Sequence, residues 1–389
     1  MPSPVVANFV LAPVPSSSPH GPEKVLTVDD PGGSASRVEI QYVAEGAANV
    51  VWSLGSNPSL KETLLRLRKG TWSGEELSPQ ASKKQRPPPP FISTVEVLEH
   101  FYKLVKPLFE PGELVDQELV RVEPSLVERC NAHLDEIERA GLRPKTRCRW
   151  HIKHDETFGM LITSMLPTSE AGALFHLKPK WLAQSPTAPP NARRCRTCAL
   201  AAKRGTDPTQ TVCSLALCSG DEVSVRAQIE RLVVGNALLY KDESLSHGGN
   251  DRASLRASPA AASTEAIITR LTALFLPDGK AHKLLKRLCL LQQHYDPSGV
   301  LRLRPGADTS DLAMAMTLRD ATMFVKLSAD SADVRLGDLD PKSGENENKV
   351  QQWRETENGL INNGWYTGEE DEALRKGGKV HTTCFLWDR

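Results

Sequence analysis

Residues 38–54 read VEIQYVAEGAANVVWSL, and this stretch decides the fold of the N-terminal half of the chain. Apolar and polar residues alternate over 38–42, and a second apolar stretch at 50–54 follows a turn of small residues. This pattern predicts two antiparallel strands joined at residues 45–49. A third strand is expected at 64–68, which completes a small antiparallel sheet.

On either side of this sheet the sequence is less regular. Residues 1–36 are rich in proline, serine and glycine, which predicts a disordered tail. Residues 70–91 contain a basic run and four consecutive prolines, so we expect a disordered surface insertion there. Helical periodicity at 93–107 and 124–140, followed by a strand at 159–165, completes an expected N-terminal lobe over 37–165.

Residues 166–389 are expected to form a larger mixed lobe. Strands are predicted at 173–177, 322–327 and 333–339, and helices at 222–234, 264–276, 280–295 and 311–319. The stretch before residue 219 is rich in proline, arginine and cysteine and is expected to be irregular. The predicted class is therefore α+β with two lobes, a small β-rich one and a larger mixed one.

Composition limits the possible functions. Of the 389 residues, 39% are hydrophobic and 25% charged, and 48 basic residues balance 48 acidic ones. This balance argues against a generally basic nucleic-acid binder but not against one cationic pocket. No apolar run reaches the ~18–20 residues that span a bilayer. Residues 1–19 have no basic segment before their short apolar stretch, so we expect no secretory signal there. Eight irregularly spaced cysteines fit a reducing compartment, so we expect a soluble intracellular protein.

The turn at Gly46, Ala47, Ala48 and Asn49 is a candidate nucleotide-binding loop. Small side chains let backbone N–H groups approach phosphates closely. Arg66, on the next strand, could point at the same phosphates, since guanidinium matches phosphate geometry. A plain hairpin turn and a solvent-facing arginine are the alternatives.

A second candidate is an acid-free cationic stretch between Glu170 and Asp207. Its seven basic residues are Lys178, Lys180, Arg193, Arg194, Arg196, Lys203 and Arg204. In an extended segment the two lysines of Lys178-Pro179-Lys180 lie on one face, where they could bind several phosphates. The alternative is a solvated basic loop.

Two aspartates and a group of cysteines complete the candidates. Asp320 lies between apolar segments and could be a general base or a helix cap. Asp338, at the end of a predicted strand, could bind Mg²⁺ or belong to an ordinary turn. The cysteines have the spacing of a possible structural zinc site, although the loose second pair favours unpaired, reduced thiols; they are Cys195, Cys198, Cys213 and Cys218.

Several segments, taken in order, resemble the inositol-pentakisphosphate 2-kinase family. They are YVAEGAAN (42–49), LLRL (64–67), LKPKW (177–181), LRDATMF (318–324), GDLDPK (337–342) and WRET (353–356). The stretch RRCRTC (193–198) is similar to the fungal branch. The resemblance covers roughly residues 38–370 and implies a two-lobed, distantly protein-kinase-like fold.

The resemblance also implies an activity. It is the transfer of the ATP γ-phosphate to the 2-hydroxyl of inositol 1,3,4,5,6-pentakisphosphate, which gives the hexakisphosphate (phytate). ATP, Mg²⁺ and the inositol phosphate would be its ligands, and a monomer in the nucleus and cytoplasm is expected.

Roles follow residue by residue from the resemblance. Asp320 would be the base, Asp338 would bind Mg²⁺, and the turn at 46–49 with Arg66 would bind the nucleotide. The residues implied for the inositol phosphate are Lys178, Lys180, Lys203 or Arg204, Lys342, Lys349 and Trp353. His176 stands where the family usually has glutamate, and Leu238 near a position where plant relatives have arginine.

Two alternatives remain. One is a catalytically weakened relative that binds inositol polyphosphates as a sensor or scaffold. The other is an unrelated zinc-stabilised interaction module built on the cysteines of residues 195–218.

Overall fold

The computed structural model describes twelve ranges of the chain. They are residues 3–12, 23–28, 36–55, 57–70, 92–148, 150–167, 172–236, 253–257, 263–304, 306–342, 347–378 and 380–387. The chain divides into two compact units, the first ending at Met165 and the second beginning at Leu166. Both contain strands and helices, which confirms the predicted α+β class.

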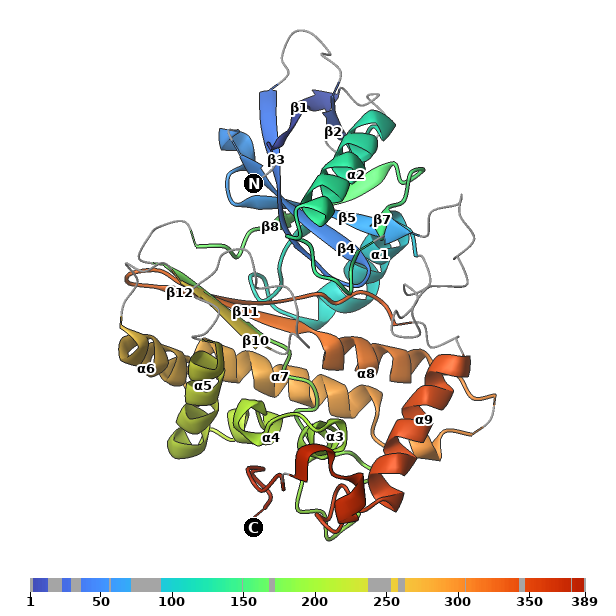
Figure 1. The fold of residues 1–389 in the computed structure, drawn as a ribbon, viewed down its shortest axis with the longest axis vertical. Helices are drawn as coiled ribbons and strands as arrows, with labels where there is room; N and C mark the ends of the chain where they lie inside the picture. Colours follow the sequence, from blue (N-terminus) through green and yellow to red (C-terminus); the bar gives the residue numbers. More distant parts are fainter. Residues whose placement is uncertain are drawn as a thin grey trace. The chain divides into compact units, whose positions relative to one another are not determined.

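The N-terminal unit is built on an eight-stranded sheet (Figure 1). Its strands are β1 (Val5–Ala12), β2 (Glu23–Thr27), β3 (Ser36–Glu45), β4 (Asn49–Gly55), β5 (Thr63–Gly70), β6 (Gln117–Val122), β7 (His151–Ile152) and β8 (Phe158–Thr163). They are ordered β4-β3-β1-β2-β6-β8-β5-β7, and a further β4–β5 pairing closes the sheet on itself. Only the pairing of β2 with β6 is parallel among those described.

The predicted strands β3, β4 and β5 are present; β4 alternates between buried and partly exposed residues, whereas β5 is buried along almost its whole length. Ile40, Trp52 and Leu65 are fully buried on the inner face. Helix α1 (Thr94–His100) begins with a capping box between Ser93 and Glu96 and packs against β6 and β8. Helix α2 (Pro124–Arg139) packs against β1, β2 and β7 and buries the apolar face that its periodicity predicts.

The prediction of a disordered tail over 1–36 is wrong for its described part. Strand β1 lies between β2 and β3 in the sheet, and Val5, Ala7 and Phe9 are buried in the core. The short alternation at 5–10 is enough to form a strand because two neighbouring strands satisfy both of its edges. Composition averaged over 36 residues concealed it.

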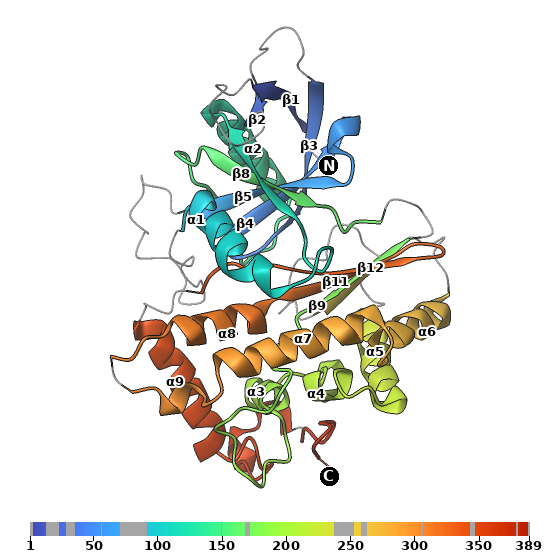
Figure 2. The same cartoon turned by 180° about the vertical axis from the view of Figure 1, so that it is seen from behind.

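The C-terminal unit is built on a four-stranded antiparallel sheet, ordered β10-β9-β11-β12. The strands are β9 (Ala173–Leu177), β10 (Ala253–Ala257), β11 (Thr322–Leu327) and β12 (Ala332–Gly337). The helices are α3 (Arg196–Arg204), α4 (Ser214–Leu217), α5 (Glu222–Asn236), α6 (Thr264–Phe275), α7 (Lys280–Tyr295), α8 (Ser310–Asp320) and α9 (Glu347–Asn362). Figures 1 and 2 show α5, α6 and α7 side by side on one side of this sheet.

The segment before residue 219 is more regular than predicted. It contains α3, which ends at Gly205 in the left-handed conformation (φ 67°), and the short α4. Helix α9 was also missed, because its polar surface hides the few apolar residues that it buries. Residues 71–91 of the predicted insertion and Leu238 lie outside the described residues. Among the helices described, none combines the length and the apolar character needed to cross a membrane.

Candidate active site

The main candidate site lies at one edge of the C-terminal sheet. The last residues of β9 and β12 pair with the first residues of β11. Because these strands are antiparallel, the segments just beyond their ends lie next to one another. Those segments carry Lys178, Asp320 and Asp338, three residues that the sequence singles out separately.

Each carboxylate oxygen of Asp320 forms an ion pair with a lysine. Lys180 Nζ is 2.6 Å from Oδ1, and Lys342 Nζ is 2.6 Å from Oδ2. Lys178 Nζ lies 3.8 Å from Asp320 Oδ1 and 2.5 Å from Asp338 Oδ2. Three ammonium groups thus face the two carboxylates, and Asp340 adds a further negative charge near Lys178. Such a cluster can exchange its carboxylates for the phosphates of a ligand.

The charges of the cluster hold its members ionised. Burial alone would raise the pKa of Asp320, but the neighbouring lysines, led by Lys342, outweigh it and hold that pKa far below its usual value. Burial alone would lower the pKa of Lys178, but Asp338 and Asp320 raise it. At neutral pH Asp320 is therefore a carboxylate and Lys178 an ammonium.

Backbone strain is concentrated at this site. Lys180 and Asp338 both have φ of 57°, in the left-handed region that side chains other than glycine rarely adopt. Only one further non-glycine residue among those described, Glu62, has a positive φ. Such conformations cost about 1–3 kcal/mol each and persist where the surroundings hold them. Two of them in one cluster are typical of a functional site.

Gln292 of α7 fixes the segment that carries Lys180. Its side-chain amide donates to the Lys180 carbonyl at 2.9 Å, and its Oε1 accepts from the Leu182 backbone N–H at 3.1 Å. Gln292 is buried, so both bonds are shielded from water. Sequence reasoning missed this residue because nothing in its spacing distinguishes it from other polar positions of the helix.

Trp181 provides a second support next to Lys180. Its ring lies between two guanidinium groups, those of Arg319 at 3.5 Å and Arg196 at 4.6 Å from the ring centroid. Arg319 also pairs with Asp296 at 2.7 Å, and Arg196 with Glu357 at 3.1 Å. These buried contacts hold Trp181 against α8 and the start of α3, and the Arg196–Glu357 pair links α3 to α9.

The basic residues of the acid-free stretch do not form one cationic surface. Arg194 is completely buried and pairs with Glu370 at 2.8 Å, and Arg196 pairs with the buried Glu357. Arg193 stacks on Trp387. These arginines are structural, because acids from distant parts of the chain neutralise them or aromatic rings cover them. From this stretch, Lys178 and Lys180 belong to the cluster around Asp320 and Asp338.

The predicted turn of the N-terminal unit joins β3 and β4. The Gly46 N–H donates to the Asn49 carbonyl at 2.9 Å, and Gly46 and Ala47 are exposed. Arg66 lies opposite Val51 in the sheet, and its Nη2 donates to the side-chain oxygen of Asn49 at 2.7 Å once the amide is oriented to satisfy its neighbours. Arg66 is buried, so the alternative of a solvent-facing strand residue is wrong.

A buried ion cluster anchors this turn, and sequence reasoning missed it. Glu45, directly before Gly46, pairs with Lys69 and with Arg143, both at 2.7 Å, and all three side chains are inaccessible to solvent. Burial opposes the charge of Glu45, but the Arg143 hydrogen bonds and the Lys69 charge lower its pKa. Burial lowers the pKa of Lys69 to about 8 despite Glu45. Charge thus holds together the end of β3, strand β5 and the loop that follows α2.

The model of the inositol-pentakisphosphate 2-kinase family matches residues 42–359, which include the turn, Arg66 and the whole aspartate cluster. The chain belongs to this family. A fungal relative named inositol-pentakisphosphate 2-kinase, from Yarrowia lipolytica (strain CLIB 122 / E 150), is 29% identical over 191 residues. The match covers 49% of this chain and 52% of the relative, so it spans about half of the relative's length.

The remaining residues that the sequence analysis predicts to bind the inositol phosphate lie on α3 and α9. Lys203 and Arg204 are in the last turn of α3, and Lys203 Nζ lies against Gly359 of α9. Lys349 is on the exposed face of α9, whereas Trp353 packs against the apolar cluster around Val300. The structure therefore places two of these residues on α3 and two on α9, and their role in binding the inositol phosphate stays a prediction.

His176, where the resemblance leads us to expect glutamate, lies in the middle of the C-terminal sheet. It lies on β9 opposite Phe324 of β11, and the two rings are in contact at 5.8 Å. The aromatic ring of Phe324 on the neighbouring strand accounts for a histidine at this position.

The predicted cysteine set is wrong in one member. Cys195, Cys198 and Cys213 do come together, but the fourth cysteine beside them is Cys384. Cys218 instead lies next to Cys289 of α7. The spacing of Cys213 and Cys218 suggested a pair, yet α4 lies between them and directs the two side chains to different neighbours.

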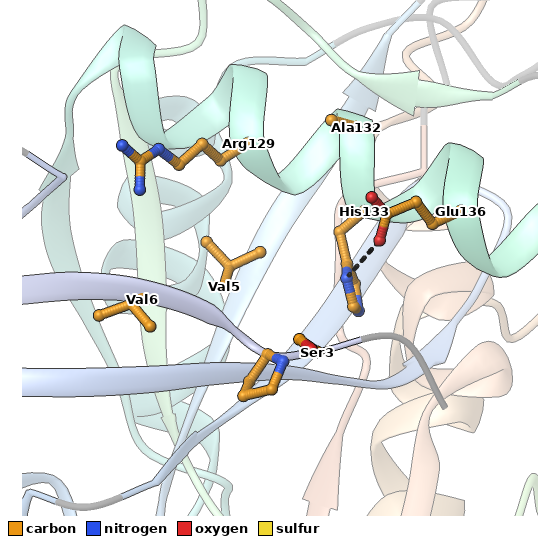
Figure 3. A pocket seen from close by; sticks show the side chains of 8 residues that line it. Ser3, Val5, Val6, Arg129, Ala132, His133 and Glu136 are labelled. Atoms are coloured by element: carbon orange, nitrogen blue, oxygen red, sulfur yellow. Dashed lines mark ion pairs between the residues drawn. The ribbon is translucent and has the colours of Figure 1, made fainter.

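A pocket of about 330 Å³ lies between β1 and α2 in the N-terminal unit (Figure 3). Its wall includes Val5, Arg129, His133 and Glu136, and His133 Nδ1 lies 3.8 Å from the Glu136 carboxylate, a contact that is an ion pair only when the imidazole is protonated. Burial lowers the pKa of His133 although Glu136 opposes this, so the imidazole is neutral at neutral pH. None of the candidate site residues described above lines this pocket.

Proposed function

We propose that this protein transfers the γ-phosphate of ATP to the 2-hydroxyl of inositol 1,3,4,5,6-pentakisphosphate and so forms inositol hexakisphosphate. The observation that carries the proposal is the cluster of Lys178, Lys180 and Lys342 around Asp320 at the edge of the C-terminal sheet. Family membership supports it, as does the name of the relative. A substrate with five phosphates requires several cations close together, and the acceptor hydroxyl requires a carboxylate among them.

The lysines and the aspartate would act in sequence. Without substrate, the three ammonium groups hold the pKa of Asp320 so low that it is a weak base. Substrate phosphates would draw Lys178, Lys180 and Lys342 away from the carboxylate. The pKa of Asp320 would then rise. Its carboxylate would accept the proton of the 2-hydroxyl while the hydroxyl oxygen attacks the γ-phosphorus of ATP. Binding of the correct acceptor thus activates the base.

The nucleotide would bind at the Gly46–Asn49 turn. The exposed residues Gly46 and Ala47 would let phosphate oxygens approach the turn, and the buried guanidinium of Arg66 would reach them by exchanging its bond to Asn49. Asp338 has the chemistry to hold Mg²⁺, because its carboxylate is partly exposed at the end of a strand. When bound, the ion would neutralise charge on the transferred phosphoryl group. In the absence of ligands Lys178 supplies the positive charge beside Asp338.

The direct test is incubation of the full chain with Mg-ATP and inositol 1,3,4,5,6-pentakisphosphate, with the products separated by anion-exchange chromatography. We expect inositol hexakisphosphate and ADP in equal amounts. Binding of the pentakisphosphate without turnover, measured by calorimetry, would support the alternative of a sensor or scaffold. Absence of both turnover and binding would contradict the proposal.

Lys178→Ala is expected to weaken the binding of the pentakisphosphate by about 10- to 100-fold. The variant loses one charge-assisted hydrogen bond, which contributes about 1.5–3 kcal/mol. Calorimetry at two salt concentrations checks this, because the lost contact is electrostatic and the salt dependence should also decrease. Lys283→Ala, at an exposed position of α7, is the matched control and should bind normally. Unchanged affinity of Lys178→Ala would exclude Lys178 from the site.

A further inference from the structure

The two lysines nearest to Asp320 are carried by segments outside helices and strands. Lys180 follows β9 and Lys342 follows β12, and neither residue belongs to a regular element. A lysine side chain has a flexible stem of four carbons, so the place of its ammonium group depends on how firmly the backbone beneath it is held. Because the sheet ends before both residues, other contacts have to fix these two backbones.

Thr317 of α8 holds the segment that carries Lys342. Its hydroxyl accepts from the Lys342 backbone N–H at 3.2 Å and donates to the Asp340 carbonyl at 3.4 Å. Only 1% of Thr317 is exposed, so water does not compete for these bonds. The two bonded residues lie on either side of Pro341, which has no N–H of its own and a fixed φ. One hydroxyl therefore fixes the turn from which the Lys342 side chain extends.

Gln292 of α7 has the corresponding place beneath Lys180. Besides its bond to the Lys180 carbonyl, its side-chain amide donates to the Leu318 carbonyl at 3.4 Å. Leu318 follows Thr317 in the chain and lies two residues before Asp320. One buried amide thus joins the segment of Lys180 to the end of α8, the same helix end that holds the segment of Lys342.

We propose that Thr317 and Gln292 are positioning residues of the acceptor site. Thr317 holds Lys342 on one side of Asp320, and Gln292 holds Lys180 on the other. The end of α8 is their common reference, because it carries Asp320 itself. Thr317 and Asp320 are three residues apart and so lie on the same side of the helix. The spacing between the carboxylate and its two cations is therefore set by buried groups that do not touch the substrate.

The inference rests on the proposed function for the identity of the substrate. A phosphate that replaces Asp320 as the partner of a lysine requires the ammonium group at a defined place, and a shift of about 1 Å can cost about 100-fold in rate. Each positioning residue acts through one lysine and leaves the other unchanged. A residue that only stabilised the fold would affect both lysines alike.

Chemical labelling of lysines tests the inference without any ligand. Acetic anhydride reaches an amino group when that group leaves its ion pair, and mass spectrometry gives the rate at each lysine. Thr317→Val keeps the shape of the side chain but lacks the hydroxyl. We expect it to raise the rate at Lys342 by about two- to fivefold, the effect of losing a partly exposed ion pair, with no change at Lys180. Thr317→Ser keeps the hydroxyl and should label as the wild type does, with the exposed Lys283 as internal reference.

Gln292→Asn should give the reverse pattern. Its amide is drawn back by one methylene group, so labelling should become faster at Lys180 and stay unchanged at Lys342. Circular dichroism verifies that each variant is folded, and the Thr317 variants, which differ least in shape, decide the outcome if Gln292→Asn is not. Equal changes at both lysines in folded Thr317→Val, or no change at either, would overturn the inference.

A double-mutant cycle relates the inference to binding. Thr317→Val alone is expected to weaken the binding of inositol pentakisphosphate by about 2- to 10-fold, the effect of one or two neutral hydrogen bonds. In a Lys342→Ala background the same substitution should have almost no further effect, because it acts through that lysine. Formation of the hexakisphosphate together with additive effects would contradict the positioning role alone. The expected labelling pattern in a protein that forms no hexakisphosphate would contradict the proposed function alone.

Discussion

Asp320→Asn is expected to lower kcat by at least ~100-fold, because the variant cannot accept the proton of the acceptor hydroxyl. Asparagine keeps the shape of the side chain, so the nearby backbone changes little. The carboxylate is held between Lys180 and Lys342 at 2.6 Å from each, which places it where an acceptor with phosphates on both sides would present its hydroxyl. Single-turnover measurement with saturating Mg-ATP separates this chemical effect from product release.

Substrate affinity should move in the opposite direction. Removing the carboxylate frees Lys180 and Lys342 and removes a negative charge that repels the substrate phosphates. We therefore expect Asp320→Asn to bind the pentakisphosphate at least as tightly as the wild type, as measured by calorimetry. Asp311→Asn, an exposed aspartate in the first turn of the same helix, is the control and should have normal kcat and affinity. A near-normal kcat for Asp320→Asn would remove it from the role of base.

The sequence predicts the periodic elements well because their signal is local. Strands β3 and β4 alternate over enough residues for the buried face to be recognised, and α2 repeats its apolar residues at helical spacing. Strand β1 has the same alternation but lies among prolines and serines. Its stability depends on pairing with β2 and β3, which composition cannot show. The error over 1–36 therefore concerns tertiary pairing, not propensity.

The candidate site could be predicted in its parts but not in its assembly. Lys178, Asp320 and Asp338 each had an ordinary alternative, and antiparallel pairing of three strands brings them together. Gln292 and Cys384 act through contacts with residues far away along the chain, so no local spacing identifies them. The reverse holds for the arginines of the cationic stretch. Their clustering suggested a ligand, whereas distant glutamates neutralise Arg194 and Arg196.

The net charge of zero conceals two kinds of ion pair, in each of which a cation lies beside an acid that is far away in the sequence, as Arg194 does beside Glu370 and Lys180 beside Asp320. Where the pairing is buried, as at Arg194, the charge is structural. Where it is partly exposed, as at Lys180, a ligand with higher charge can replace the acid. The accessibility of the pair therefore separates binding from structural cations, and the sequence does not contain this information.

Glu45→Gln should reduce the free energy of unfolding of the N-terminal unit by about 3–5 kcal/mol. Glutamine preserves the size of the side chain but leaves Lys69 and Arg143 as buried cations without their shared counter-ion. Hydrogen exchange of the β3, β4 and β5 amides measures the loss within this unit, and the C-terminal unit supplies an internal reference. Because Gly46 follows directly, the variant should also bind ATP more weakly.

Glu118→Gln is the matched control, since Glu118 forms an ion pair with Lys24 on the same sheet at an exposed position. Exposed pairs contribute about 0–1 kcal/mol, so this variant should unfold almost as the wild type does. Equal effects of the two substitutions would show that the buried cluster is not what holds the turn.

The effect of Glu45→Gln should also depend on pH. The folded state holds the pKa of Glu45 below its usual 4.5, so the unfolded chain binds this proton more readily than the folded protein does. The stability that Glu45 contributes is therefore fully present above about pH 4.5 and is lost as the pH falls through the folded-state pKa. The difference in unfolding free energy between wild type and Glu45→Gln should be largest near neutral pH and should shrink in acid. Denaturation at pH 7 and at acidic pH checks this, and a difference that grows in acid would mean that Glu45 is protonated in the folded protein.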